Sequence, residues 1–285
     1  MKIERHVFGS RTGYTTLARS TGLIASDCRI LEVFAFGQTS DRGYLQSLAK
    51  VPAHISRPLT GNRRAITRVF PGQADNKGRN TFLLISVVLR NSDWIGVLKG
   101  DVLPLLGQSD MWQWDGTPQL ASLNVAISGP NPLALEGTEA TEIVGLISEI
   151  ERLCATKQNV VISEPKYALS TVRAIEMLIP DSAKLRFSCA ARSLSANLDV
   201  NLNCVARGVG VSSVGPGSQV YRPRTDGILS PYAAELVRGK IMQGRIPRDV
   251  IRSYRGFGAV EAEEEREKHS HAEKSLDEWR GLASR

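Results

Sequence analysis

The sequence has no long apolar run and no apolar leader. Its longest apolar run, Phe82 to Leu89, spans eight residues and includes Ser86, whereas a membrane span requires about 18 apolar residues. The first ten residues, MKIERHVFGS, lack the apolar core of a secretory signal. We therefore expect a cytoplasmic protein without a membrane span.

Cysteine is scarce, and the four cysteines are far apart in the chain. Cys28, Cys154, Cys189 and Cys204 form no CxxC pair, so the spacing indicates neither a zinc ribbon nor a redox motif. Two of them fall on expected strands and Cys154 falls on the apolar face of an expected helix. We expect buried free thiols in a reducing compartment.

The short motifs of common enzymes are also missing. No serine has a G-x-S-x-G context, and the glycine-rich run at 208–217 lacks the GK[ST] ending of a phosphate-binding loop, which favours a flexible connector. The histidines are His6, His54, His269 and His271, and the last two lie in a charged stretch. A metal site would need His6 and His54 to converge with a carboxylate, and an unrecognised hydrolase would need one of them beside a carboxylate and a hydroxyl. We expect no catalytic residues, no metal and no cofactor.

What the chain does contain is typical of a globular protein. Apolar residues make up 42% of the 285 residues and charged residues 23%, enough for about two domains. We predict an α+β protein with a mixed-sheet N-terminal domain over residues 1–128 and a small α/β domain over 134–210. A helical, partly flexible C-terminal tail is expected over 218–285. The SGPNP segment at 128–132 is the clearest boundary between the first two.

The stretch from Arg57 to Leu89 organises the N-terminal region. It predicts strands over 65–70 and 81–89, joined by a polar turn, and the apolar run in the second strand indicates burial on both faces of a sheet. The other expected elements of this region are strands over 3–10, 14–18 and 120–127, helices over 28–36 and 41–49, and a strand or short helix over 94–98.

Helical spacing of apolar residues marks the second region. It predicts helices over 138–154 and 165–179, the second ended by Pro180, and a compact strand over 159–163. Alternating apolar residues predict strands over 185–191 and 198–204. Two further helices are expected from Ser230 to about Gln243 and from Pro247 to Tyr254, followed by a charge-dense helical tail.

Positive charge is concentrated around the organising stretch. The net charge is +7, and six cations flank or interrupt the two strands: Arg57, Arg63, Arg64, Arg68, Lys77 and Arg79. They could bind phosphates of a nucleic acid, contact an acidic protein, or form a plain solvated surface. Few aromatic residues interleave with them and no nucleic-acid-binding module is recognisable, which favours a rim around the buried strand that contacts protein.

The opening HVFGSRTGYTTLARSTGL contains a glycine, a second glycine followed by an apolar residue, and an L-A-x-S ending, in this order: Gly9, Gly13, Tyr14, Leu17, Ala18 and Ser20. A Gly-Arg pair later precedes the buried strand, and Ile179–Pro180 ends a helix shortly before Phe187–Ser188. These features resemble the N-terminal and middle domains of a bacterial GTPase-associated adaptor family, called GTPase-associated protein one. The C-terminal region departs from that family, because it lacks a large third domain.

The resemblance implies a non-enzymatic adaptor of a bacterial GTPase-linked conflict (antiviral defence) or signalling system. Such a protein would bind a partner protein, a GTPase encoded nearby, through its N-terminal domain. The residues expected to contact the partner are Arg11, Tyr14, Arg63, Arg64, Arg68 and Arg79. The alternative is a nucleic-acid-binding protein that uses the Arg57–Arg79 face.

Overall fold

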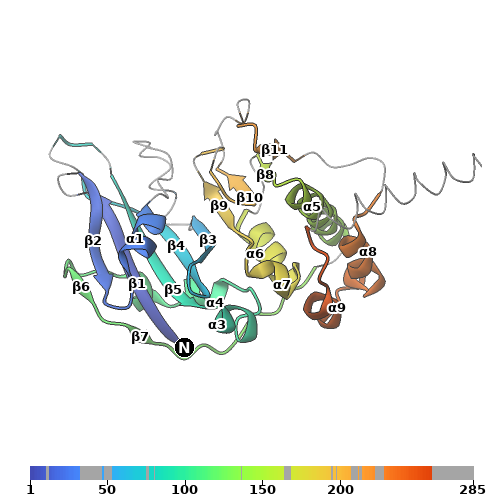
Figure 1. Cartoon of the computed structure of the whole chain (residues 1–285), viewed down its shortest axis with the longest axis horizontal. Helices are drawn as coiled ribbons and strands as arrows, with labels where there is room; N and C mark the ends of the chain where they lie inside the picture. Colours follow the sequence, from blue (N-terminus) through green and yellow to red (C-terminus); the bar gives the residue numbers. More distant parts are fainter. Residues whose placement is uncertain are drawn as a thin grey trace, which may run out of the picture.

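The computed structural model contains both helices and strands, as the sequence predicts, arranged around one large mixed sheet (Figure 1). It describes residues 1–10, 13–32, 47, 53–74, 77–79, 81–135, 137–163, 168–193, 195–196, 198–206, 211, 214–221 and 228–258. The eleven strands of the sheet follow the order β11-β8-β10-β9-β3-β4-β5-β1-β2-β6, and β7 pairs with β1.

The N-terminal strands form the antiparallel half of the sheet. They are β1 (Lys2–Ser10), β2 (Tyr14–Ser20), β3 (His54–Leu59), β4 (Arg63–Pro71) and β5 (Phe82–Arg90), with the short β6 (Gln119–Leu120) and β7 (Leu123–Asn124) beside β2 and β1. The strands expected around 3–10, 14–18, 65–70 and 81–89 are confirmed. The segment at 94–98 resolves as a helix, α3 (Asn91–Gly96), and the helix α1 (Ala25–Glu32) begins three residues before its expected start. The helix expected over 41–49 lies almost entirely outside the described residues.

β3 was not predicted, because Pro58 interrupts its pattern. A proline removes a backbone donor and is tolerated where a strand has no neighbour on that side. The pairing meets this condition, since β9 pairs only with His54 to Ser56, while β4 pairs with the whole of β3.

The strands β11 (Ser218–Val220), β8 (Asn159–Ile162), β10 (Leu202–Val205) and β9 (Cys189–Ser193) form the parallel half of the sheet. The helices α5 (Gly137–Ala155) and α6 (Ala168–Leu178) fall where helical spacing predicts them. The strand expected over 185–191 begins only at Cys189, because the short helix α7 (Asp181–Lys184) follows Pro180 and its last turn extends through Phe187.

One sheet joins the strands of both expected domains. β3 pairs antiparallel with β9, and Ile55 lies opposite Ala190. The segment expected as a linker is also fixed, because Arg173 on α6 donates to Asp101 at 2.8 and 3.0 Å and to the carbonyls of Asn131 and Pro132. The division into domains at residues 128 and 134 therefore stays a prediction.

Helices cover both faces of the sheet. On one face, α5 and α6 pack on the parallel half, and α3, α4 (Leu103–Leu106) and the 3-10 helix η1 (Ser109–Trp112) pack on the antiparallel half. On the other face, Cys28 and Leu31 of α1 pack against Ala65 and Val88. β5 is buried on both faces, as its apolar run predicts: Leu84 is 1% exposed and Val87 is fully buried.

The C-terminal helices belong to the core. The helices α8 (Pro231–Arg238) and α9 (Arg248–Ser253) and the 3-10 helix η2 (Ile241–Gln243) place Tyr232, Leu236, Ile241 and Ile251 in the cluster around α5 (Figure 1). The helices expected from Ser230 and from Pro247 are present, and the charge-dense stretch at 261–268 lies outside the described residues. None of the described helices has the length and apolar character needed to cross a membrane.

Candidate functional site

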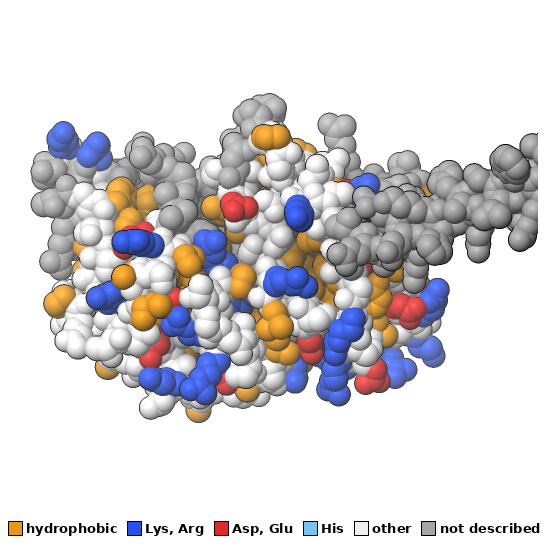
Figure 2. Space-filling view, viewed as in Figure 1, with side chains coloured by type: hydrophobic (Ala, Val, Ile, Leu, Met, Phe, Trp, Pro, Cys, Tyr) orange, Lys and Arg blue, Asp and Glu red, His pale blue; other side chains and the backbone are white. Residues whose placement is uncertain are grey.

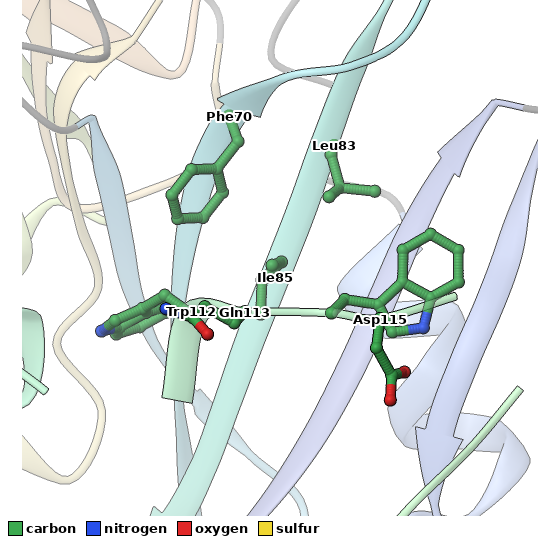
Figure 3. A pocket seen from close by; sticks show the side chains of 7 residues that line it. Phe70, Leu83, Ile85, Trp112, Gln113 and Asp115 are labelled. Atoms are coloured by element: carbon green, nitrogen blue, oxygen red, sulfur yellow. The ribbon is translucent and has the colours of Figure 1, made fainter. Parts of the chain in front are cut away.

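A hollow with a volume of about 420 Å³ lies among the described residues on the antiparallel half of the sheet (Figure 3). Its lining is mostly apolar and aromatic, and the hollow is called the aromatic groove below. The residues that line it are Phe70, Leu83, Ile85, Trp112, Gln113, Trp114 and Asp115.

Strand pairing builds the floor of the aromatic groove. Phe70 of β4 lies opposite Leu83 of β5, and Arg68 lies opposite Ile85, so all four side chains project from one face of the sheet. Figure 3 shows Leu83 and Ile85 on the same strand, with the Phe70 ring beside them. Phe70 and Leu83 are half-buried, and Ile85 is buried.

Hydrogen bonds fix the segment that forms the walls. The Trp112 indole donates to the Leu105 carbonyl at 2.9 Å, and the Trp114 indole donates to the Thr117 carbonyl at 2.7 Å. Arg5 of β1 donates to the carbonyls of Asp110 and Gln113 at 3.3 and 3.2 Å. The two indoles are therefore held in place, in a segment for which the sequence predicts neither a helix nor a strand. The W-x-W spacing, in a chain with four tryptophans, was the available signal.

Arg68 places a positive charge over two of the lining rings, although it does not itself line the groove. Its guanidinium carbon lies 4.8 Å from the centre of the Phe70 ring and 5.2 Å from the Trp112 ring, within the range of cation–π interactions. Its Nε atom is buried and has no hydrogen-bond partner among the described residues. Burial lowers the pKa of Arg68, and no acidic side chain opposes that effect. The groove thus has a partly desolvated cation without a counter-ion in the described part of the chain.

Asp115 carries the opposite charge elsewhere on the groove. Its carboxylate accepts hydrogen bonds from the Thr117 backbone at 3.0 Å and hydroxyl at 2.7 Å. These bonds lower the pKa of Asp115, with a smaller contribution from Arg5, so the group is ionised at neutral pH. In Figure 3 the carboxylate points away from Phe70 and Leu83, so it does not neutralise that part of the groove.

The structure corrects the expected exposure of Arg64. This side chain is only 1% exposed, so it is not part of a rim. Its guanidinium donates to the Ser56 hydroxyl at 2.7 Å, to the carbonyls of Lys184 and Phe187 at 2.9 Å each, and to Glu176 at 3.0 Å. Because these bonds use its donors inside the protein, Arg64 is not available to a partner.

Among the remaining expected contact residues, Tyr14 and Arg63 lie at opposite ends of β5, because Tyr14 packs on Phe82 and Arg63 lies opposite Arg90. Tyr14 is 44% exposed and its ring stacks on Phe82, with the centroids 4.5 Å apart. Arg63 forms an ion pair with the buried Asp27 at 2.9 Å, and Arg79 is exposed. Arg11 lies outside the described residues.

The six cations do not form one positive face. Side chains alternate along a strand, so Arg63 projects from the face opposite Arg64 and Arg68. Arg57 is half-buried, and its guanidinium donates to the Ile30 carbonyl at 3.5 Å. In the space-filling view, Lys and Arg side chains are spread over the visible face instead of gathered in one patch (Figure 2).

His6 does meet a hydroxyl and a carboxylate. Its Nε2 atom lies 2.9 Å from the Thr16 hydroxyl, which donates to Glu32. Since the Thr16 proton points to Glu32, the network assigns an N–H to His6 Nε2, which donates to Thr16. This direction is the reverse of a hydroxyl activated by histidine. Burial, and then Arg19, lowers the pKa of His6 to about 4, so the ring is neutral at pH 7. The arrangement fits a structural network.

His54 and the cysteines add no reactive group to the described part of the chain. Burial, followed by Arg68 and Arg64, lowers the pKa of His54 to about 3. Among the described residues, no three His, Cys, Asp or Glu side chains are placed to hold a metal ion; His269 and His271 lie outside this part. All four cysteines are free, as predicted, with Cys154 half-buried and the others buried. Burial raises the pKa of Cys204 to about 12 and, together with Glu151, that of Cys154 to about 11.

Two comparisons with known proteins found no match. No family model matches the chain, and no curated protein matches it. The resemblance to the GTPase-associated adaptors therefore stays a prediction.

Proposed function

We propose that this protein is a non-enzymatic adaptor that binds a segment of a partner protein in the aromatic groove of its N-terminal half. The observation that carries this proposal is the groove itself: an open hollow with aromatic walls and an apolar floor, beside an arginine, Arg68, that has no counter-ion among the described residues. Aromatic residues and arginine are the side chains most enriched at the energetic centres of protein interfaces.

The shape of the site favours binding over chemistry. Its walls are held by hydrogen bonds from Arg5, Trp112 and Trp114 to backbone carbonyls, so a ligand would meet a preformed surface. Neither His6 nor His54 lines this hollow.

The opening stretch of the chain contacts the groove. Gly9 lies opposite Leu83, and a Cβ atom added at Gly9 would come within 2.9 Å of Leu83 Cδ1. The glycine in the stretch that resembles the GTPase-associated adaptors thus allows β1 to lie close to a residue of the groove. On this basis the proposed partner is a GTPase encoded nearby, within a conflict or signalling system.

Binding to the neighbouring GTPase tests the proposal. The full chain is immobilised, and the purified GTPase is applied in its GDP-bound and GTP-bound forms. We expect binding in at least one form and a loss of at least tenfold in affinity for Leu83→Ser, because this residue lies at the floor of the groove. The control is Ile24→Ser, which alters an exposed apolar residue that does not line the groove and should change affinity less than twofold. Absence of binding in both nucleotide states contradicts the choice of a GTPase.

The nucleic-acid alternative has lost part of its basis, because Arg64 is buried and Arg63 is paired with Asp27. It predicts retention on immobilised DNA or RNA that falls steeply with salt and is lost in Arg63→Glu/Arg64→Glu. Since Arg64→Glu would place an unpaired charge in the core, Arg68→Glu and Arg79→Glu are the more informative variants.

A further inference from the structure

We infer that the aromatic groove recognises a partner segment in which an acidic side chain lies next to an apolar one, with the carboxylate paired to Arg68. This inference rests on the proposed function and names the chemistry of the bound segment.

The first step is the missing counter-ion. Arg63, Arg64 and Arg173 each have a carboxylate partner within 3.0 Å, in Asp27, Glu176 and Asp101. Arg68 is also partly buried, yet it has neither an ion pair nor a hydrogen bond within the described ranges, and its Nε donor is buried. A buried donor without an acceptor is costly, and native proteins rarely leave one unsatisfied. An acceptor brought by a ligand would remove that cost.

The second step is the position of the charge relative to the apolar surface. The guanidinium lies over Phe70 and Trp112, and both rings line the groove. A carboxylate that reaches Arg68 therefore enters at the edge of the groove, and the neighbouring part of the ligand lies on Leu83 and Ile85. A ligand with only charge, such as a polyanion, would leave this apolar floor uncovered.

The third step concerns the type of anion. Within the described ranges, Arg68 lies over the lining rings of Phe70 and Trp112 without a carboxylate, whereas Arg5 donates to backbone carbonyls of the wall and lies near the ionised Asp115. Because Asp115 offsets Arg5, the charge left for a ligand is that of Arg68, which suits a single carboxylate better than a chain of phosphates, which several cations usually bind. A short acidic and apolar peptide segment fits this charge distribution.

The experiment selects peptides with the full-length protein. A phage library of random dodecapeptides is selected on the wild type, on Arg68→Met and on Arg68→Lys, with Arg90→Glu as a control at an exposed arginine on the adjacent strand. We expect wild type, Arg68→Lys and the control to enrich peptides with Asp or Glu within two positions of an aromatic or aliphatic residue. Arg68→Met should lose the acidic preference. The affinity of a selected peptide should fall about ten- to a hundredfold in that variant, as for a hydrogen bond to a charged group.

The remaining outcomes separate the two proposals. Peptides whose binding depends on Leu83 but shows no acidic preference and no Arg68 dependence overturn the inference and leave the protein-binding groove intact. Failure to enrich any peptide that depends on Leu83 overturns both. A labelled single-stranded oligonucleotide that binds more tightly than the peptides and is released by Arg68→Met assigns the groove to nucleic acid and also overturns both. Equal thermal midpoints of the variants exclude unfolding as the cause of any loss.

Discussion

Arg64 of β4 donates a hydrogen bond to Glu176 of α6 at 3.0 Å, and each side chain is only 1% exposed. The ion pair lies between the antiparallel half of the sheet, which carries the aromatic groove, and a helix that covers the parallel half. Burial raises the pKa of Glu176, and the charge of Arg64 opposes that rise. The packing of the two halves against each other therefore depends on an ion pair that water does not reach.

Removing one member of this pair should destabilise the protein strongly. Arg64→Met leaves the Glu176 carboxylate buried without its cation, and breaking a buried pair in this way typically costs about 3–5 kcal/mol. The free energy of unfolding in urea measures the effect. The control is Arg238→Met, because the Arg238–Glu235 pair is exposed and such pairs contribute at most about 1 kcal/mol. If the free energy of unfolding falls equally in the two variants, the buried Arg64 pair stabilises the protein no more than an exposed pair does.

Gly100 should tolerate no side chain. It has a φ of +82°, and a Cβ atom would lie 2.3 Å from the Glu176 carbonyl oxygen and 2.9 Å from its carbon. Gly100→Ala must therefore displace α6 from this loop, and we expect a loss of about 2 kcal/mol or more, as for strained or overpacked substitutions. Gly96→Ala is the matched control in the same region, because no atom lies within 4 Å of the added Cβ. Thermal midpoints of the two variants, compared with the wild type, decide the matter.

Local patterns predicted most of the elements but not their contacts. The apolar run of β5 and the helical spacing of α5 are properties of a few neighbouring residues, and both elements lie where expected. The environment of Arg64 depends on residues more than 100 positions away, so its charge indicated exposure when the structure buries it. Local patterns could not predict the aromatic groove either, because β4, β5 and the segment around Trp112 meet only in the folded chain.

The central strand gives a test of packing on both faces. Leu84 belongs to the cluster that contains Val69 and Phe82, and Val87 belongs to the opposite cluster with Trp94 and Leu98. Leu84→Ala and Val87→Ala should each cost about 2–4 kcal/mol, the range for truncation of a buried aliphatic side chain. The exposed Leu185, at 41% exposure, provides the control, and Leu185→Ala should cost less than about 0.5 kcal/mol. If only one of these two substitutions lowers the free energy of unfolding, the strand lies at the edge of the core.

The two buried histidines should make stability depend on pH in a defined window. His6 and His54 have pKa values of about 4 and about 3 in the folded chain, against 6.5 for the free side chain. Between these values and 6.5 the unfolded chain binds more protons than the folded chain, so acidification favours unfolding. The stabilisation is complete above about pH 7 and is lost as the pH falls. Each histidine should account for a loss of about 2 kcal/mol between pH 7 and pH 5.

Urea titrations at pH 7, 6 and 5 measure this dependence, with His6→Gln and His54→Gln as the variants. Each substitution should reduce the loss of unfolding free energy between pH 7 and pH 5 by about 2 kcal/mol, whatever it does to stability at pH 7. The change in unfolding free energy between pH 7 and pH 5 is compared between each variant and the wild type. Groups that the substitution does not contact contribute equally to both proteins, so their contribution cancels. If His54→Gln leaves the pH dependence of the unfolding free energy as it is in the wild type, the His54 imidazole is protonated in the folded protein near its ordinary pKa. That result would conflict with its position beside Arg64 and Arg68, since a protonated ring there would add a third positive charge to a site with one carboxylate.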